Sequence, residues 1–190
     1  MINGINSREM ILEILLEIEE GEHSHVAIRN ALSEYQFLPK QVRAFITRVC
    51  EGTLEYRIQI DYIINSFSKV TVDKMKPAIR EILRSAVYQL KYMDSVPDSA
   101  VCNEAVKLAQ RKGFYNLKLF VNGVLRTIAR EMDQVRFPQK EDDLLKYLSV
   151  KYSMPEVLVT RWLEAYGEET TEKILADFLT SNTQKINETK

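Results

Sequence analysis

The sequence predicts an all-α protein, a helical bundle followed by a small C-terminal helical segment. Only 6 Gly and 5 Pro occur in 190 residues, which disfavours an architecture of short strands and tight turns. Apolar residues recur at helical spacing through successive segments, and no segment alternates as a half-buried strand does. Because 45% of the residues are apolar, a chain of this length can bury a core without disulfides or metals.

The first two predicted helices lie near the N-terminus. Asn6 and Ser7 are both good N-caps for the first helix, and Gly21 ends it because glycine readily takes the left-handed conformation found after helices. A shorter helix follows over roughly residues 26–35. The side of the first helix expected to be buried is a stripe of Met10, Ile11, Ile14, Leu15 and Ile18.

The longest apolar pattern covers residues 39–67. Gly52 interrupts it, and glycine inside a helix costs about 1 kcal/mol relative to alanine, so this glycine marks either close packing or a break. Further helices are predicted from Pro77, and from the turn at 96–99 to Gly113. The helix after that has the most regular pattern, with an apolar side of Leu117, Phe120, Val121, Val124, Leu125 and Ile128.

The stretch 136–140 (Arg-Phe-Pro-Gln-Lys) is the best candidate for a domain boundary. We therefore expect one domain over residues 1–136 and a helical linker segment over 137–190. Within the linker, residues 153–156 (Ser-Met-Pro-Glu) have the spacing of a capping box, and Gly167 fits the end of the helix that it opens. Three helical patterns make up the linker, over residues 142–152, 153–167 and 169–179.

Charge is unevenly distributed along a chain whose net charge is −1. Residues 1–34 hold two Arg and seven Glu, a local balance of −5. Residues 101–130 hold six Lys or Arg and one Glu, a local balance of +5. A nearly neutral chain divided in this way is expected to have an acidic face and a basic face.

Polar side chains spaced by four residues form a column on the most regular helix. The column consists of Lys118, Asn122, Arg126 and Arg130. Consecutive members are about 6 Å apart along the axis because an α-helix rises 1.5 Å per residue, which is close to the phosphate spacing of a nucleic-acid strand. Lys107 and Arg111 form a second, short column on the preceding helix. Such columns predict RNA binding if carboxylates do not neutralise them; the alternative is a solvated face whose charges pair with other elements.

Other titratable residues give weaker signals. His23 and His25 lie among glutamates in a loop-like stretch, which is more typical of a solvated loop than of a metal site. Cys50 and Cys102 lie in apolar-periodic segments and are interpreted as reduced core thiols. The acidic run 141–143 complements the dipole at a helix start and is not interpreted as a catalytic pair.

The remaining motifs point away from catalysis. Trp162, Tyr152 and Tyr166 are interpreted as a small core rather than as a platform for base stacking. The sequence contains no glycine-rich phosphate loop, no Gly-x-Ser-x-Gly and no Cys-x-x-Cys, so no catalytic, cofactor or metal site is predicted. A signal-peptide pattern and a long apolar span are both absent, so we expect a cytoplasmic protein without membrane contact.

Four segments resemble the NusB-like family in their order and spacing. They are residues 43–48 (Arg-Ala-Phe-Ile-Thr-Arg) with Gly52, 86–90 (Ala-Val-Tyr-Gln-Leu), 103–109 (Asn-Glu-Ala-Val-Lys-Leu-Ala) and 120–126 (Phe-Val-Asn-Gly-Val-Leu-Arg). The resemblance covers roughly residues 7–132. It implies a bundle of two packed three-helix halves, with RNA bound by basic residues.

Two features favour the RsmB (Sun) branch of this family, the 16S rRNA cytosine-C5 methyltransferases. A freestanding NusB would end near Met132, yet this chain continues for more than fifty residues. Residues 153–156, 161–163 and 166–169 look like the segment that leads to the catalytic core in that branch. The resemblance implies that S-adenosylmethionine belongs to a downstream catalytic domain, and that this chain carries no cofactor or catalytic residue of its own.

The sequence thus predicts an RNA-docking domain that holds 16S rRNA for a methyltransferase domain downstream in cis. The expected RNA-binding residues are Arg8, Lys107, Arg111, Lys112, Lys118, Asn122, Arg126 and Arg130. Single-stranded or irregular RNA is the expected target because an A-form duplex hides its base edges. Two alternatives are an antitermination factor that works with a ribosomal protein partner, and a helical protein-interaction bundle without an RNA role.

Overall fold

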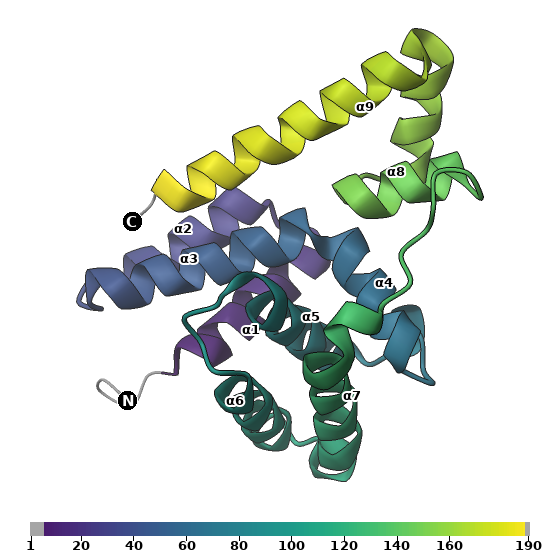
Figure 1. The fold of residues 1–190 in the computed structure, drawn as a ribbon. Coiled ribbons are helices and arrows are strands. Elements are labelled where there is room, and N and C mark those ends of the chain that lie inside the picture. Colours follow the sequence, from purple (N-terminus) through teal and green to yellow (C-terminus); the bar gives the residue numbers. More distant parts are fainter. Residues whose placement is uncertain (1–5, 189–190) are drawn as a thin grey trace.

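The computed structural model describes residues 6–188, with side chains described as far as residue 180, and every regular element in that range is helical, as predicted. The α-helices are α1 (Ser7–Glu19), α2 (Ser24–Glu34), α3 (Lys40–Glu55), α4 (Arg57–Phe67), α5 (Pro77–Tyr92), α6 (Asp98–Arg111), α7 (Lys118–Glu131), α8 (Leu144–Tyr152) and α9 (Glu156–Glu188) (Figure 1). Short 3-10 turns are η1 (Val72–Lys74), η2 (Tyr115–Leu117) and η3 (Met132–Gln134). None of the described helices is long and apolar enough to cross a membrane.

Helix α5 is the centre of the bundle. It contacts α1 and α3 on one side and α4, α6 and α7 on the other, and its residues from Ile79 to Gln89 are almost all buried. The two predicted three-helix groups are α1–α3 and α5–α7, with α4 between them, and both groups contribute to one continuous hydrophobic core. The Asn6 side chain caps α1 by accepting hydrogen bonds from the backbone N–H groups of the first turn, as predicted.

The long apolar pattern over residues 39–67 forms two helices, and the break between them is not at Gly52. The chain leaves helical geometry at Tyr56, which separates α3 from α4. Gly52 stays helical, and a Cβ atom at this position would overlap the phenol ring of Tyr88 on α5. Close packing of α3 on α5 is therefore the reason for this glycine.

A polar cluster is buried between α4 and α5. The Arg84 guanidinium donates to Asp61 through Nε and NH2, each at 2.7 Å, and to Glu81 Oε1 at 2.5 Å. Burial raises the pKa of Glu81, although Arg84 acts in the opposite direction. Because a buried charge without a partner is costly, this cluster fixes how α4 sits on α5.

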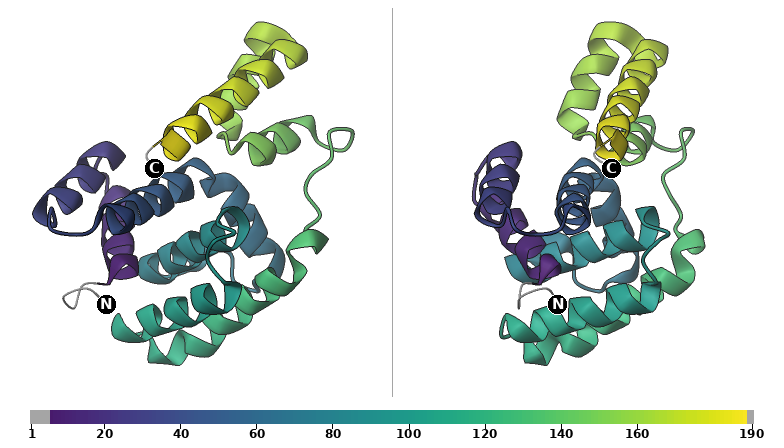
Figure 2. Two further views of the ribbon diagram at one scale, coloured as in Figure 1. Left: turned by 60° about the vertical axis from the view of Figure 1, so that its left-hand side comes forward. Right: turned by 90° about the vertical axis from the view of Figure 1, so that its left-hand side faces the viewer.

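Helices α8 and α9 form a separate small layer with its own core of Leu148, Val159 and Leu175. Helix α9 folds back on itself at Gly167, whose φ of 73° is left-handed, as the sequence predicted for a helix end. Its second part returns over α3, so that the layer covers one side of the bundle (Figure 1, Figure 2).

The capping box predicted at Ser153 and Glu156 does not form. Ser153 has a left-handed φ of 51° and ends α8. Its hydroxyl accepts a hydrogen bond of 3.0 Å from the backbone N–H of Ile58, in the first turn of α4. The residue therefore caps a helix distant in the sequence, which local spacing does not reveal.

Candidate nucleic-acid interface

Helices α6 and α7 form an antiparallel hairpin at the end of the molecule opposite α9 (Figure 1, Figure 2). Each helix buries one apolar stripe in the main core, which leaves its polar stripe on the outside. One hydrogen bond across the hairpin, from Arg126 NH2 to Asn103 Oδ1 at 3.1 Å, shows the register of the two helices. The predicted columns are thus held on one rigid unit.

The two predicted columns lie side by side across this hairpin. Since Arg126 faces Asn103, one helical turn along each helix places Lys107 opposite Asn122, and a second turn places Arg111 opposite Lys118. All six side chains are exposed except that of Asn122, which is half-buried. We call this surface the hairpin ridge: Asn103, Lys107, Arg111, Lys118, Asn122 and Arg126.

Asn103 was missed as a site residue by the sequence analysis. It extends the column of Lys107 and Arg111 by one further step of four residues, and that spacing was the available signal. Its side-chain oxygen and that of Asn122 both accept hydrogen bonds from Arg126, at 3.1 and 3.0 Å. Two neutral amides therefore orient the guanidinium without cancelling its charge.

Three cations of the ridge keep their charge available. Arg111 and Lys118 are exposed and form no ion pair among the described residues. Among the described residues, the Arg126 guanidinium bonds to the amide oxygens of Asn103 and Asn122 and forms no ion pair. Together they are an electropositive surface of the kind that phosphate groups bind.

The other predicted cations on this hairpin are partly neutralised. Lys107 pairs with Glu104 at 2.7 Å, and this contact lowers the pKa of the glutamate. Arg130 pairs with Glu131 at 2.6 Å. Both side chains remain largely exposed, so water screens these pairs and their net stabilisation is small.

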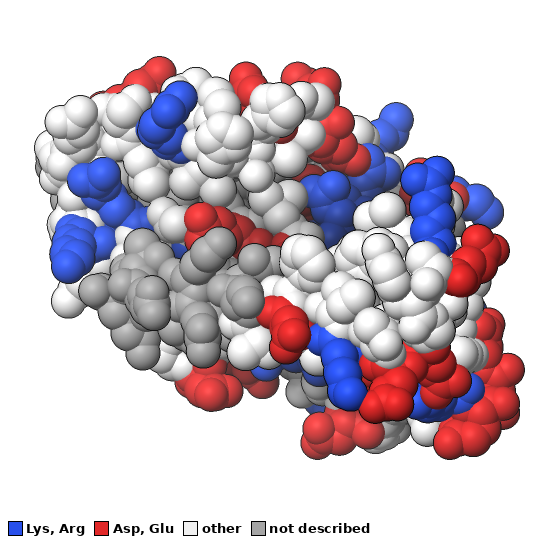
Figure 3. Space-filling view, turned by 90° about the horizontal axis from the view of Figure 1, so that it is seen from above, with Lys and Arg blue, Asp and Glu red and all other residues white. Residues whose placement is uncertain are grey.

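Lys112 is the most strongly neutralised of the predicted set. It reaches across to α1 and pairs with Glu9 and Glu13, each at 3.0 Å, and the hydrogen bonds that its ammonium donates to both carboxylates raise the pKa of Lys112. The predicted acidic and basic regions therefore meet at the end of α6, where Lys112 contacts α1. The face seen from above, on the side of α9, also mixes acidic and basic side chains (Figure 3). Lys140 pairs with Glu168 and Lys151 pairs with Glu172 in the C-terminal layer.

Arg8 is not one of the ridge residues, but it lies next to α6, where it lines a small pocket with Val101, Ala105 and Leu108. Its guanidinium is half-buried, with Cζ 5.4 Å from the centre of the Phe45 ring, and burial lowers its pKa while Glu104 acts in the opposite direction. Arg8 therefore packs within the bundle, and only local rearrangement would bring it to a phosphate.

The weaker candidates are two buried thiols and two exposed imidazoles. Cys50 and Cys102 are free, buried thiols, as interpreted from the sequence. His23 and His25 are exposed, as expected, but His25 lies in the first turn of α2 and not in a loop, and the two rings stack with centres 5.9 Å apart. No group of three potential metal ligands occurs among the described residues.

The C-terminal aromatic residues only partly form the predicted small core. Trp162 and Tyr152 pack against the core of α8 and α9, and the indole stacks on Phe178 with ring centres 5.8 Å apart. Tyr166, which was expected in the same core, is 56% exposed.

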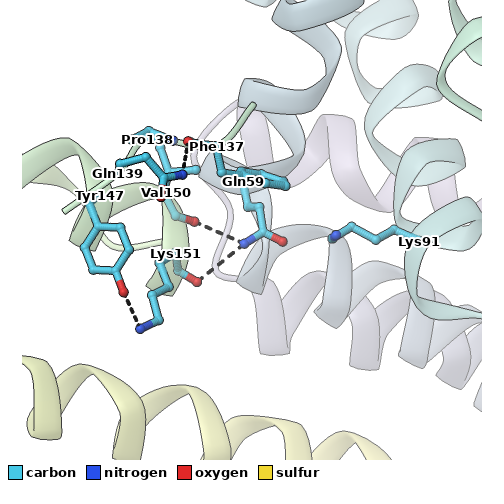
Figure 4. Close-up of a pocket in the computed structure, with 8 residues that line it drawn as sticks. All are labelled: Gln59, Lys91, Phe137, Pro138, Gln139, Tyr147, Val150 and Lys151. Atoms are coloured by element: carbon cyan, nitrogen blue, oxygen red, sulfur yellow. Dashed lines mark hydrogen bonds between the residues drawn. The ribbon is translucent and has the colours of Figure 1, made fainter. Parts of the chain in front are cut away.

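A cavity of about 260 Å³ lies at the joint between the bundle and the C-terminal layer (Figure 4). Gln59 on α4 donates to the carbonyl oxygens of Val150 and Lys151 at the end of α8, at 3.2 and 3.4 Å. On the bundle side the ammonium of Lys91 lies 5.4 Å from the centre of the Phe137 ring. Since most polar groups around this cavity already bond to one another, we interpret it as the seam of the joint.

Comparisons with known proteins agree with this fold. The model of the NusB family matches residues 5–130. The chain is 35% identical over 168 residues to the probable ribosomal RNA small subunit methyltransferase B of Bacillus subtilis, covering 88% of this chain and 37% of that protein. It is 32% identical over 130 residues to the transcription antitermination protein NusB of Dictyoglomus thermophilum, covering 68% of this chain and 85% of that protein.

A solved structure extends the likeness beyond the bundle. The crystal structure of PH0851 superposes with a TM-score of 0.69 and 20% identity, covering 91% of this chain and 38% of that one. At this identity the match supports the fold alone. This chain thus spans well under half the length of the methyltransferase relative and of PH0851.

Proposed function

The chain belongs to the NusB family, and from that premise we propose that it is an RNA-binding module whose contact surface is the hairpin ridge. The observation that carries this proposal is the set of three exposed cations, Arg111, Lys118 and Arg126, which form no ion pair with a carboxylate among the described residues. Uncompensated cations on a rigid support bind phosphates with little reorganisation, because the helices already fix their spacing.

We further propose that the module serves a small-subunit rRNA methyltransferase. The methyltransferase relative aligns over 88% of this chain, past the bundle, whereas the NusB relative aligns over 68%. In this proposal residues 1–136 form the RNA-binding domain and 137–190 the segment that leads to a catalytic domain in cis. That domain would bind S-adenosylmethionine and methylate cytosine C5 of 16S rRNA, while this chain only holds the RNA.

The proposal predicts a modest and salt-dependent affinity for single-stranded RNA. Each phosphate contact releases counterions from the RNA. With three contacts, a plot of the logarithm of the binding constant against the logarithm of the salt concentration is expected to have a slope of roughly −2. Replacing Lys118 or Arg126 by Gln is expected to weaken binding roughly two- to fivefold. Each replacement is also expected to reduce the magnitude of the slope by roughly 0.7.

Two variants serve as controls in the same anisotropy titration with an rRNA fragment. Arg130→Gln is expected to have a smaller effect than Arg126→Gln because Glu131 already neutralises Arg130. Lys146→Gln removes an exposed cation on α8, far from the hairpin, and is expected to change nothing. Equal effects of the Lys118 and Lys146 variants would show that RNA does not bind at the ridge.

A further inference from the structure

The turn of the α6–α7 hairpin exposes two large apolar side chains. Tyr115 is 65% exposed and Leu119 is 76% exposed. The Tyr115 ring makes no ring contact and its hydroxyl no hydrogen bond among the described residues. A single exposed apolar residue is ordinary, but an aromatic ring and a leucine one helical turn apart are a small apolar surface that the fold does not use.

The backbone that carries Tyr115 is held firmly. Gly113, with φ of 87°, turns the chain out of α6, and the Phe114 N–H donates to Ala109 O at 2.9 Å. The Phe114 side chain packs against the main core, and η2 contacts both α6 and α7. The tyrosine ring is therefore presented on a fixed support and not on a loose loop, which lowers the entropic cost of binding to it.

Two cations that form no ion pair among the described residues lie just before and just after Tyr115 in the sequence. Arg111 ends α6 and Lys118 begins α7, and both are exposed. Their positive charge favours a polyanion over a neutral or basic protein surface at this turn. Single-stranded nucleic acid combines what the turn offers, since its bases stack on aromatic side chains while its phosphates bind cations.

We propose that Tyr115 stacks on an unpaired base of the bound RNA, with the adjoining phosphates at Arg111 and Lys118. This inference rests on the proposed RNA binding and adds to it the side chain that contacts an unpaired base. In a duplex the bases already stack on each other, so Tyr115 gains nothing there.

The test uses a single-stranded oligoribonucleotide of about ten nucleotides, containing one 2-aminopurine, and a fully paired duplex of the same length. Tyr115→Ala is expected to weaken binding of the single strand roughly 5- to 150-fold, the range for loss of one base–aromatic stack. Binding of the duplex and the salt slope are expected to stay unchanged. Tyr115→Phe keeps the ring and is expected to bind within roughly twofold of the parent.

A matched control is Tyr166→Ala, which removes a similarly exposed tyrosine from α9. It is expected to leave both affinities unchanged, and far-UV circular dichroism checks that each variant is folded. The 2-aminopurine fluorescence is expected to change on binding to the parent and to Tyr115→Phe, but not to Tyr115→Ala.

Different failures have different meanings. If Tyr115→Ala binds the single strand like the parent while Lys118→Gln binds it less well, stacking is excluded and RNA binding at the ridge stands. If both variants bind like the parent, both proposals fail. Equal weakening of single strand and duplex by Tyr115→Ala, or the same loss with Tyr115→Phe, also overturns stacking on an unpaired base.

Discussion

Two lysines in the α6–α7 hairpin show how position decides the role of a charge. Lys112 and Lys118 are six residues apart in the sequence and flank the same turn. The first lies next to the glutamates of α1 and pairs with Glu9 and Glu13, whereas the second begins α7 and points into solvent. Only Lys118 is therefore available to a phosphate without first breaking ion pairs.

The role of Gly52 gives a prediction at the same scale. Gly52→Ala adds a Cβ atom where the Tyr88 phenol lies, so α3 and α5 must move apart or the ring must shift. Overpacking of this kind is expected to lower the free energy of unfolding by about 1–3 kcal/mol. Urea denaturation followed by far-UV circular dichroism measures the change.

The matched control is Gly123→Ala in α7. Nothing lies within 4 Å of the added Cβ atom there, and the residue is exposed in the middle of a helix. Alanine is expected to stabilise the helix by up to about 1 kcal/mol because it restricts the unfolded chain more than glycine does. If Gly52→Ala is as stable as the parent, the Tyr88 ring can move aside without lowering the free energy of unfolding.

At the scale of elements, α4 and α8 cap each other at the joint. The Ser153 hydroxyl accepts from Ile58 N–H at the start of α4, and the Gln59 amide donates to carbonyl oxygens at the end of α8. Backbone groups at helix ends lack intrahelical hydrogen-bond partners. Here α8 and the residue after it supply a partner for an N–H group of α4, and α4 supplies a partner for carbonyl groups of α8. Tyr62 adds a hydrogen bond of 2.7 Å from its hydroxyl to Arg136 O.

Removal of the Ser153 hydroxyl should therefore loosen this joint. Ser153→Ala is expected to destabilise the protein by about 0.5–2 kcal/mol, as for a lost N-cap. Fluorescence of Trp162, the one tryptophan of the chain, reports on the C-terminal layer during urea denaturation. Ser66→Ala removes a hydroxyl on α4 that bonds only to Tyr62 O within its own helix, and it is expected to be neutral. If Ser153→Ala and Ser66→Ala unfold at the same urea concentration, the Ser153 hydroxyl does not stabilise the joint.

The α8–α9 layer should also respond to acid through Glu172. Hydrogen bonds from Lys151 at 2.9 Å and Lys140 at 3.0 Å lower the pKa of this carboxyl to about 2, from 4.5. Because the pKa is lower in the folded state, the ionised carboxyl stabilises the fold at pH values above its ordinary pKa. This stabilisation is lost as the pH falls toward 2. The Trp162 transition should thus shift to lower urea concentration between about pH 5 and 2.

Glu172→Gln is expected to reduce the change of the urea midpoint with pH, because the amide does not titrate. Glu164→Gln changes an exposed carboxyl on the same helix that forms no described ion pair, and it should keep the shift of the parent. If Glu172→Gln and the parent lose stability equally over this pH range, other carboxyl groups control the acid response.

At the scale of the whole molecule, the bundle and the C-terminal layer have separate cores. The main core ends at Phe137, and the second core is built from α8 and α9 alone. A fragment of residues 1–138 is therefore expected to fold and to bind single-stranded RNA within roughly threefold of the full chain, since the ridge lies on the bundle. Circular dichroism and anisotropy titration measure both properties.

A comparison of this fragment with a shorter one tests where the domain ends. A fragment of residues 1–136 lacks the Phe137 ring, which stacks on Tyr62 with ring centres 5.7 Å apart, and it is expected to be less stable than 1–138. An unfolded 1–138 fragment, or one that loses RNA affinity more than tenfold, would contradict the proposed division of roles.

Local patterns were enough to predict the helical class and the two polar columns, because helical periodicity and caps depend on residues within a few positions of one another. Asn6, Gly21 and Gly167 act where these local rules placed them. Which charges form ion pairs, where Arg8 lies and what Ser153 caps depend instead on how the helices pack. The partners in those cases, such as Glu9 for Lys112 and Ile58 for Ser153, are about a hundred residues away in the chain, and helix packing alone brings them within a few ångströms.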